Sequence, residues 1–140
     1  MVKLQYGCAS VRAHARGGLI HATVRGEVTQ LVARSIIGGA PLWSPVRSSQ
    51  VVDYSRARVK LSAEALFAAA RAVAIGDTPT ALVVGPDQLV MFADYARMAV
   101  EQGVLKQAFT SFEAAHRWAA AQAAVAEYQV RLARSRRACP

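Results

Sequence analysis

The sequence has very few of the residues that form disulfide frameworks and metal centres. Its only cysteines, Cys8 and Cys139, lie near opposite ends of the 140-residue chain and form no CxxC motif. None of the three histidines, His14, His21 and His116, is at metal-ligand spacing. We therefore expect two free thiols, no metal site and no cofactor.

Motifs that carry catalysis are also absent from the sequence. It has no Gly-x-Ser-x-Gly elbow, no phosphate-binding P-loop and no GxGxxG motif. We predict no catalytic residues and a protein that is not an enzyme. A small enzyme is kept only as the third-ranked hypothesis.

Long apolar runs are missing as well. No run approaches the roughly 18–20 residues that span a bilayer, so we expect no membrane insertion. Residues 1–7 lack the basic-then-apolar layout of a signal peptide, which predicts a cytoplasmic protein. The length suits a single domain over residues 1–140. We place its core at about 18–120 and a helical extension with a basic tail at 121–140.

Acidic residues are scarce relative to basic ones. The chain has 17 Lys plus Arg against 9 Asp plus Glu, which gives a net charge of +8. Half of this excess lies after Glu127, in a tail without acids. The cations of this tail are Arg131, Arg134, Arg136 and Arg137. Such a tail can bind a phosphate backbone or an acidic partner, although it is more often a solvated end.

The clearest secondary-structure pattern begins at Thr80. An apolar strand starts there and leads into a helix over Asp87–Gln102, which Gly103 stops. A second strand over Val104–Phe109 precedes a helix with a capping box formed by Thr110 and Glu113. Two successive β-α units with short loops predict a parallel sheet covered by helices.

The N-terminal half gives weaker signals. Beginning at the N-terminus, the expected elements are an edge strand over Val2–Tyr6, a basic loop over Cys8–Gly18, a strand over Leu19–Arg25, a helix from Gly26 to Gly38-Gly39, an irregular segment over Ala40–Ser49, a strand over Gln50–Ser55, a basic connector over Arg56–Lys60, and a helix from the N-cap Ser62 to Gly76. The expected order is β-β-α-β-α-β-α-β-α.

Several short segments carry a resemblance in addition to this order. They are Gly26-Glu-Val-Thr, Val51-Val-Asp53, Ala81-Leu-Val-Val, Phe92-Ala-Asp-Tyr-Ala-Arg-Met98, and Phe109 with Glu113-Ala-Ala-His-Arg-Trp118. Together they resemble the bacterial SpoIIAA-like (STAS-type) domains, which include anti-sigma factor antagonists and many uncharacterised small proteins. The resemblance implies an α/β fold with a mixed, mainly parallel five-stranded sheet, about four helices and a C-terminal helical extension.

The resemblance also implies a function. It suggests a non-enzymatic regulatory or interaction module that acts through an unknown protein partner or a small ligand. In the antagonists, an Asp-Ser-Ser-Gly-type turn carries a regulatory phosphoserine, and the matching stretch here is Lys60-Leu-Ser-Ala. Ser62 occupies a comparable helix start, where Arg58 and Lys60 lie close by, but the motif's Asp and Gly are absent. We favour a simple N-cap role for Ser62 over a phosphorylation site.

A candidate ligand rim is expected where the parallel strands end, because α/β ligand sites gather at that edge. Asp53 could act there as an acid or base, although an ordinary turn or ion pair is the favoured role for it. The rim comprises Asp53, Tyr54, Ser55, Ser62, Gly85 and Asp87.

A candidate interface lies on the helix over Asp87–Gln102. Met91, Tyr95 and Met98 form a stripe beside a separate core stripe. The core stripe comprises Leu89, Phe92, Ala93, Ala96 and Val100. The first stripe could seat a second copy in a homodimer or an apolar ligand; the alternative is packing beneath the C-terminal extension.

The Arg-rich termini support another class of function, which is binding to nucleic acid or to another anionic surface. Besides the tail, Arg12 and Arg16 with His14 form a basic group before Leu19. However, the basic residues are not interleaved with aromatics, and no helix-turn-helix or RNA-binding signature is present. We therefore do not expect nucleic acid to be the partner.

Overall fold

The structure is a computed structural model that describes residues 1–16, 18–39, 49–72 and 78–138. Its centre is a six-stranded sheet with the order β1-β2-β3-β4-β5-β6. The strands are β1 (Val2–Tyr6), β2 (Ala9–Arg16), β3 (Leu19–Val28), β4 (Gln50–Val59), β5 (Thr80–Val83) and β6 (Lys106–Phe109). The first three strands pair antiparallel, and β3 to β6 pair parallel. The mixed, mainly parallel sheet is confirmed, but the expected number of five strands is wrong.

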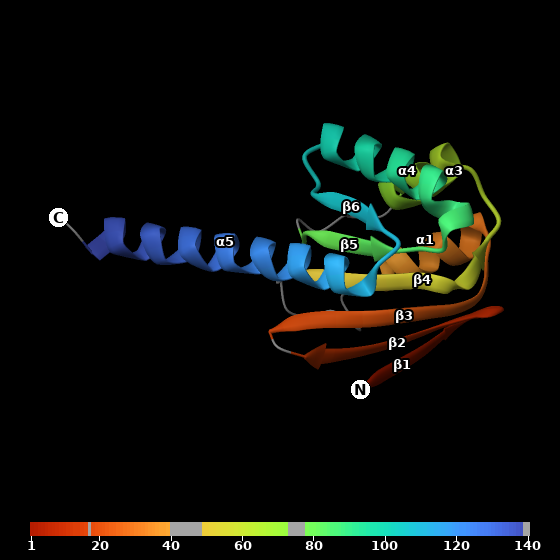
Figure 1. Cartoon of the computed structure of the whole chain (residues 1–140), viewed down its shortest axis with the longest axis horizontal. Coiled ribbons are helices and arrows are strands. Elements are labelled where there is room, and N and C mark those ends of the chain that lie inside the picture. The colour runs from red at the N-terminus through yellow and green to blue at the C-terminus, as the bar shows by residue number, and fades with distance from the viewer. Residues whose placement is uncertain (17, 40–48, 73–77, 139–140) are drawn as a thin grey trace.

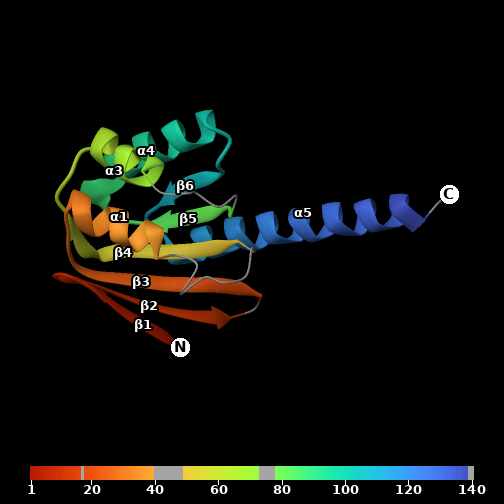
Figure 2. The ribbon, with the colours of Figure 1, turned by 180° about the vertical axis from the view of Figure 1, so that it is seen from behind.

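Helices cover both sides of this sheet. In the described part of the chain they are α1 (Gln30–Gly38), α3 (Ala63–Arg71), α4 (Leu89–Glu101) and α5 (Phe112–Ala138), with a short 3-10 turn, η1 (Pro86–Gln88). Figures 1 and 2 show α1, α3 and α4 on one side of the sheet and α5 on the other. The expected α/β architecture and the long C-terminal helix are confirmed.

The strand missing from the sequence prediction is β2, which occupies the segment expected to be a basic loop. Ala9, Val11 and Ala13 are buried, whereas Arg12 and His14 between them are exposed. This alternation is the pattern of a half-buried strand, but small alanines and charged residues disguised it. Since these residues belong to the main core, the core begins before residue 18.

Strands β3 and β4 are also longer than expected. Gly26 does not begin a helix but stays in β3, with φ at +96°, and a Cβ there would lie 2.1 Å from the Cys8 carbonyl oxygen. Only glycine accommodates this close approach of β2 to β3. Helix α1 begins later, after Thr29, whose side chain accepts a hydrogen bond from the Val32 N–H. The expected connector over 56–60 is mostly strand, because β4 continues to Val59.

Helix ends follow their capping side chains. Ser62 caps α3 as expected, and its Oγ accepts a hydrogen bond from the Ala65 N–H at 3.1 Å. For α5 the cap is Ser111, not Thr110, because the Ser111 Oγ accepts from the Ala114 N–H. Gly39 ends α1 with φ at −85°, outside the left-handed region that glycine often adopts after the last turn of a helix. The predicted helix end at Gly76 lies outside the described residues, as does most of the irregular segment 40–49.

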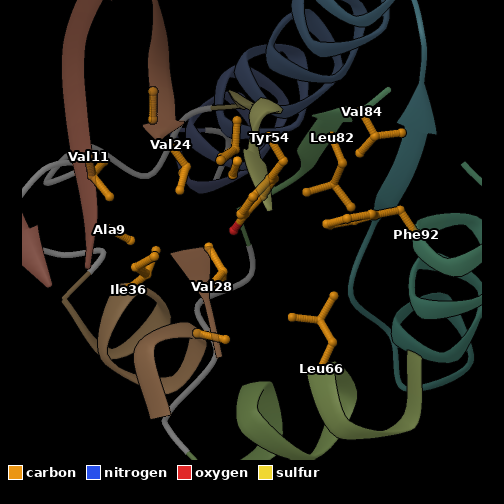
Figure 3. Packing of buried hydrophobic residues seen from close by; sticks show 14 of the residues in the cluster. Ala9, Val11, Val24, Val28, Ile36, Tyr54, Leu66, Leu82, Val84 and Phe92 are labelled. Carbon is orange, nitrogen blue, oxygen red and sulfur yellow. The ribbon is translucent and has the colours of Figure 1, made fainter. Parts of the chain in front are cut away.

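The main core lies between the sheet and the helices α1, α3 and α4. Figure 3 shows side chains of the sheet, such as Tyr54 and Leu82, meeting Leu66 and Phe92 of the helices. The ring centroids of Tyr54 and Phe92 are 5.1 Å apart. The inward face of α4 differs from the predicted stripe, since Ala93 and Val100 are exposed. The residues it buries are Phe92, Tyr95, Ala96 and Ala99.

A smaller core lies on the opposite side, beneath the first turns of α5. Ala115 and Ala119 of α5 pack there on Leu19, Val51 and Ala81 of the strands. Small alanines allow the helix to lie close to the sheet. After Ala123 every described side chain of α5 whose burial is assigned is exposed, and the helix projects beyond the body of the protein (Figure 1). Among the described elements, the contacts of α5 with the sheet are therefore chiefly with β3 to β6.

Candidate functional site

Among the residues that the structure describes, no helix packs along one face of the N-terminal half of the sheet. Helix α5 packs chiefly over β4, β5 and β6 and touches β3, while β1 and β2 lie to one side of it (Figure 1). The apolar side chains of β1 and β2 point to the opposite side, into the main core. We call the residues on the open side of β1 to β4 the uncovered face.

The uncovered face is strongly basic. Strand alternation and pairing place there the exposed cations Lys3, Arg12, Arg16, Arg25, Arg56 and Arg58. Two acids share this face, and both are engaged: Glu27 pairs with Lys60 at 2.9 Å, and Asp53 Oδ1 accepts from the Ser55 N–H at 2.8 Å. Within residues 1–16, 18–39, 49–72 and 78–138, none of the six cations forms an ion pair.

Two pairs of these cations lie directly opposite each other on neighbouring strands. Lys3 of β1 is opposite Arg12 of β2, and Arg25 of β3 is opposite Arg56 of β4. Like charges directly opposite each other on neighbouring strands destabilise a sheet. A bound anion between them would convert this repulsion into attraction.

The three histidines, which are distant in the sequence, form a row on the same side of the sheet. His14 of β2 stacks on His21 of β3 with ring centroids 5.7 Å apart, and His21 stacks on His116 of α5 at 5.2 Å. The ring of Phe112 lies 5.4 Å from that of His21 and 6.3 Å from that of His116. We call these four rings the ring row.

The interior of the ring row is buried. His21 is 6% exposed, and its Nε2 has no hydrogen-bond partner in the described part of the structure. Burial lowers the pKa of His21, and the nearby charges of His116, His14 and Arg16 lower it further. The described residues contain no cluster of His, Cys, Asp or Glu arranged to bind a metal ion. The row is therefore a stack of rings, with His14 and Phe112 at its accessible ends.

The predicted ligand rim is not assembled as one surface. Asp53 lies within β4, which continues to Val59, and not at the end of a strand. Tyr54 points the other way, into the main core, where burial raises its pKa. Ser62 starts α3 as its N-cap. Of the six rim residues, Asp53 and the exposed Ser55 lie beside the uncovered face.

Gly85 and Asp87 of the predicted rim form a local turn at the end of β5. The Asp87 Oδ1 lies 2.7 Å from the position that a Cβ on Gly85 would take. Asp53 of β4 is the strand partner of Val83 of β5, and Gly85 follows Val83 by two residues. The pairing of β4 with β5 is therefore what brings Asp53 toward Gly85 and Asp87. These residues stay candidate ligand contacts, without a described hydrogen bond that joins them.

The stripe of Met91, Tyr95 and Met98 is not an uncovered surface. Tyr95 is buried, and the two methionines are half-buried against the main core, not beneath the C-terminal extension. The Lys106 Nζ lies 2.7 Å from the Tyr95 hydroxyl, to which it donates, and burial lowers the pKa of Lys106 to about 8. Homodimer formation through this stripe stays a prediction, and the part of the stripe left for a partner is the exposed portion of Met91 and Met98.

The basic tail belongs to the exposed end of α5. Arg131 pairs with Glu127 at 2.6 Å, one turn earlier on the helix. The cations that follow it are Arg134, Arg136 and Arg137, all exposed. The tail therefore lies away from the uncovered face, and the two basic regions can be tested separately.

Comparison with known proteins adds no assignment. The chain matches no protein-family model, and no curated protein is significantly similar to it. The resemblance to SpoIIAA-like domains consequently rests on the sequence segments, while the observed order of elements has one strand more than the expected order and keeps Gly26 within β3. In the residues that the structure describes, no helix combines the length and apolarity needed to cross a membrane.

Proposed function

We propose that the protein is a non-enzymatic binding module of the SpoIIAA-like type that binds a polyanionic partner on its uncovered face. The observation that carries this proposal is the like-charged pairing of Lys3 with Arg12 and of Arg25 with Arg56 across neighbouring strands. Each pair costs stability in the free protein and gains from an anion. We infer the class of protein, an interaction module, from the sequence resemblance. We infer that the partner is an anion from the positive charge of the uncovered face.

The open sheet is a better candidate for this role than the tail. The backbone of its cations is fixed by strand pairing, so less backbone freedom is lost on binding. The tail arginines lie on a helix end without packing partners. Since a polyanion that contacts several cations releases counterions, its affinity must fall steeply as the salt concentration rises.

Calorimetric titration with heparin, a polyanion without bases, tests the proposal. The face variant Arg25→Gln/Arg56→Gln and the tail variant Arg134→Gln/Arg136→Gln remove equal charge and form a matched pair. At about 50 mM salt, where such contacts are strong, we expect the face variant to bind at least tenfold more weakly than the tail variant. Equal losses in both variants, or no binding by the wild type, would refute the proposal.

The free energy of unfolding gives an independent readout. Removing the Arg25–Arg56 repulsion should leave the unliganded face variant as stable as the wild type, or more stable by up to about 1 kcal/mol. A face variant that unfolds more easily would indicate that these arginines serve the fold. Urea denaturation distinguishes the two cases.

A second candidate function is regulation of a protein partner through phosphorylation of Ser62. The observation that favours it is that Ser62 is exposed at the first turn of α3, where its Oγ contacts the Ala65 N–H. A phosphate there would meet free N–H groups and the positive end of the helix dipole. Mass spectrometry of the protein purified from its native cells would find phosphate on Ser62. Its absence under all growth conditions would remove this candidate.

A further inference from the structure

The ring row lies beside the cations of the uncovered face. His14 and His21 are opposite each other, and the next outward-facing pair along the same two strands is Arg12 and Thr23. Two residues along a strand span about 7 Å. The backbone of His14 is therefore about 7 Å from that of Arg12, whose cross-strand partner is Lys3, and this spacing is comparable to the distance between the base and the phosphate of one nucleotide.

The rings of the row lie at small to moderate angles to one another. The angle between the ring planes is 19° for His14 and His21, 27° for His21 and His116, 25° for Phe112 and His116, and 37° for His21 and Phe112. Phe112 contacts both His21 and His116, and His14 extends this cluster across β2. Phe112 is 45% exposed, and His14 is exposed as well. A planar ligand group can therefore reach the ring row at Phe112 and at His14.

From this juxtaposition we infer that the polyanion is a single-stranded nucleic acid whose bases stack on the ring row while its phosphates contact the neighbouring cations. The inference rests on the function proposed above and narrows the partner. Stacking platforms beside basic residues are how proteins bind single strands without strong sequence preference. The strands thus bring together the aromatic and basic residues that are separated in the sequence.

Other polyanions can bind the cations of this surface but have no free flat groups to stack on its rings. A duplex keeps its bases paired and stacked inside, so it offers phosphates but no free base faces. A sulfated polysaccharide, an anionic vesicle or an acidic peptide can neutralise the cations, but none requires a stack of rings. Because only an unpaired strand offers both chemistries at a spacing of one nucleotide, it fits the face best.

Fluorescence anisotropy with labelled 12-nucleotide probes tests the inference on the full chain. The probes are oligo(dT), an abasic strand of the same length, and a blunt duplex, all at about 50 mM salt. We expect oligo(dT) to bind at least tenfold more tightly than the abasic strand, which has the same phosphates. Stacking of one base on one ring changes affinity by roughly fivefold to a hundredfold.

Two leucine variants identify the ring that stacks. Phe112→Leu keeps an apolar side chain against His21 but removes the flat ring. As a control, Tyr128→Leu removes a ring that is more exposed, 62% against 45%, from the projecting part of α5. Phe112→Leu should weaken oligo(dT) binding at least fivefold without changing abasic-strand binding. Tyr128→Leu should change neither, and circular dichroism verifies that both variants are folded.

The possible results separate the inference from the proposed function. Equal affinity for oligo(dT), the abasic strand, the duplex, heparin and anionic vesicles would overturn the inference and leave a general polyanion module. Preference for vesicles alone would indicate a membrane surface and would also overturn it. Failure of every probe to bind would refute both the inference and the proposed function.

Discussion

Replacing His21 with leucine should remove a pH-dependent part of the protein's stability. The side chain is 6% exposed, its Nε2 lacks a described partner, and its pKa is lowered by burial and by the charges of His116, His14 and Arg16. In the unfolded chain the same imidazole has an ordinary pKa of about 6.5. As the pH falls, His21 therefore becomes protonated in the unfolded chain at a higher pH than in the folded protein.

The sign of the effect follows from this difference. As the pH falls below about 6.5, the unfolded state gains protons first, so the free energy of unfolding decreases. If His21 stays neutral in the folded protein, the loss between pH 7.5 and pH 5.5 approaches but does not exceed about 1.4 kcal/mol. Leucine cannot titrate. Between pH 7.5 and pH 5.5 the free energy of unfolding of His21→Leu should therefore decrease less than that of the wild type, by a difference of up to the same amount.

Urea denaturation of both proteins at pH 7.5 and pH 5.5 measures the difference directly. His14→Leu is the matched control, because it alters the same stack at its exposed end and should retain most of the wild type's acid sensitivity. An identical decrease in stability for the wild type and His21→Leu would refute the reasoning. His21 would then be protonated or hydrated in the folded protein.

Three further predictions concern the fold. In urea denaturation, Gly26→Ala should destabilise the protein by at least about 2 kcal/mol more than Gly18→Ala. Both glycines have positive φ, but only at Gly26 would a Cβ meet backbone, 2.1 Å from the Cys8 oxygen. Equal costs would contradict the close approach of β2 to β3. Phe92→Ala should lower the free energy of unfolding by about 3–5 kcal/mol, because Phe92 is fully buried; a cost below 1 kcal/mol would show that the main core is loosely packed. NMR of the Lys106 side chain should show it titrating near pH 8. The free energy of unfolding should rise between about pH 8 and 10.5, because over this range the unfolded lysine still binds the proton that the folded lysine has lost. A titration midpoint of Lys106 above about pH 10 would contradict its burial.

The C-terminal half of the fold was predictable because its signals are local. An apolar run defines β5, and β6 follows Gly103 and the apolar Val104 and Leu105. Pro86 and Gly103 delimit the intervening helical segment, and β-α units need short connections. The cap of α5 was misplaced by one residue, from Ser111 to Thr110, because both hydroxyl residues can cap. Local chemistry thus predicted element types well and boundaries less well.

The N-terminal half depends on contacts that a single sequence does not display. Strand β2 was missed although Ala9, Val11 and Ala13 alternate with polar residues, because Arg12 and His14 resembled a basic loop. Gly26 was assigned to a helix start, whereas the backbone of β2 determines its conformation. A period-two count over residues 9–16 would have found the strand.

The candidate site was missed for the same reason. His14 meets His21 only through the register of β2 with β3, and His116 arrives from a helix about a hundred residues later in the chain. The like-charged pairs Lys3–Arg12 and Arg25–Arg56 also exist only once the strands are paired. Composition correctly indicated an excess of cations, but the sequence pointed to the tail and not to the sheet.

The projecting end of α5 has a consequence for the kinetics of association. From Ala123 to Ala138 the helix extends about 22 Å past its last packed residue, at 1.5 Å per residue. The side chains of residues 124–137 are exposed, so the arginines of this segment lie in solvent away from the body of the protein. Charges placed in this way accelerate the encounter with an anion more than they retain it. We therefore expect truncation after Tyr128 to slow association of the polyanion, most strongly at low salt, while its rate of dissociation from the sheet stays the same.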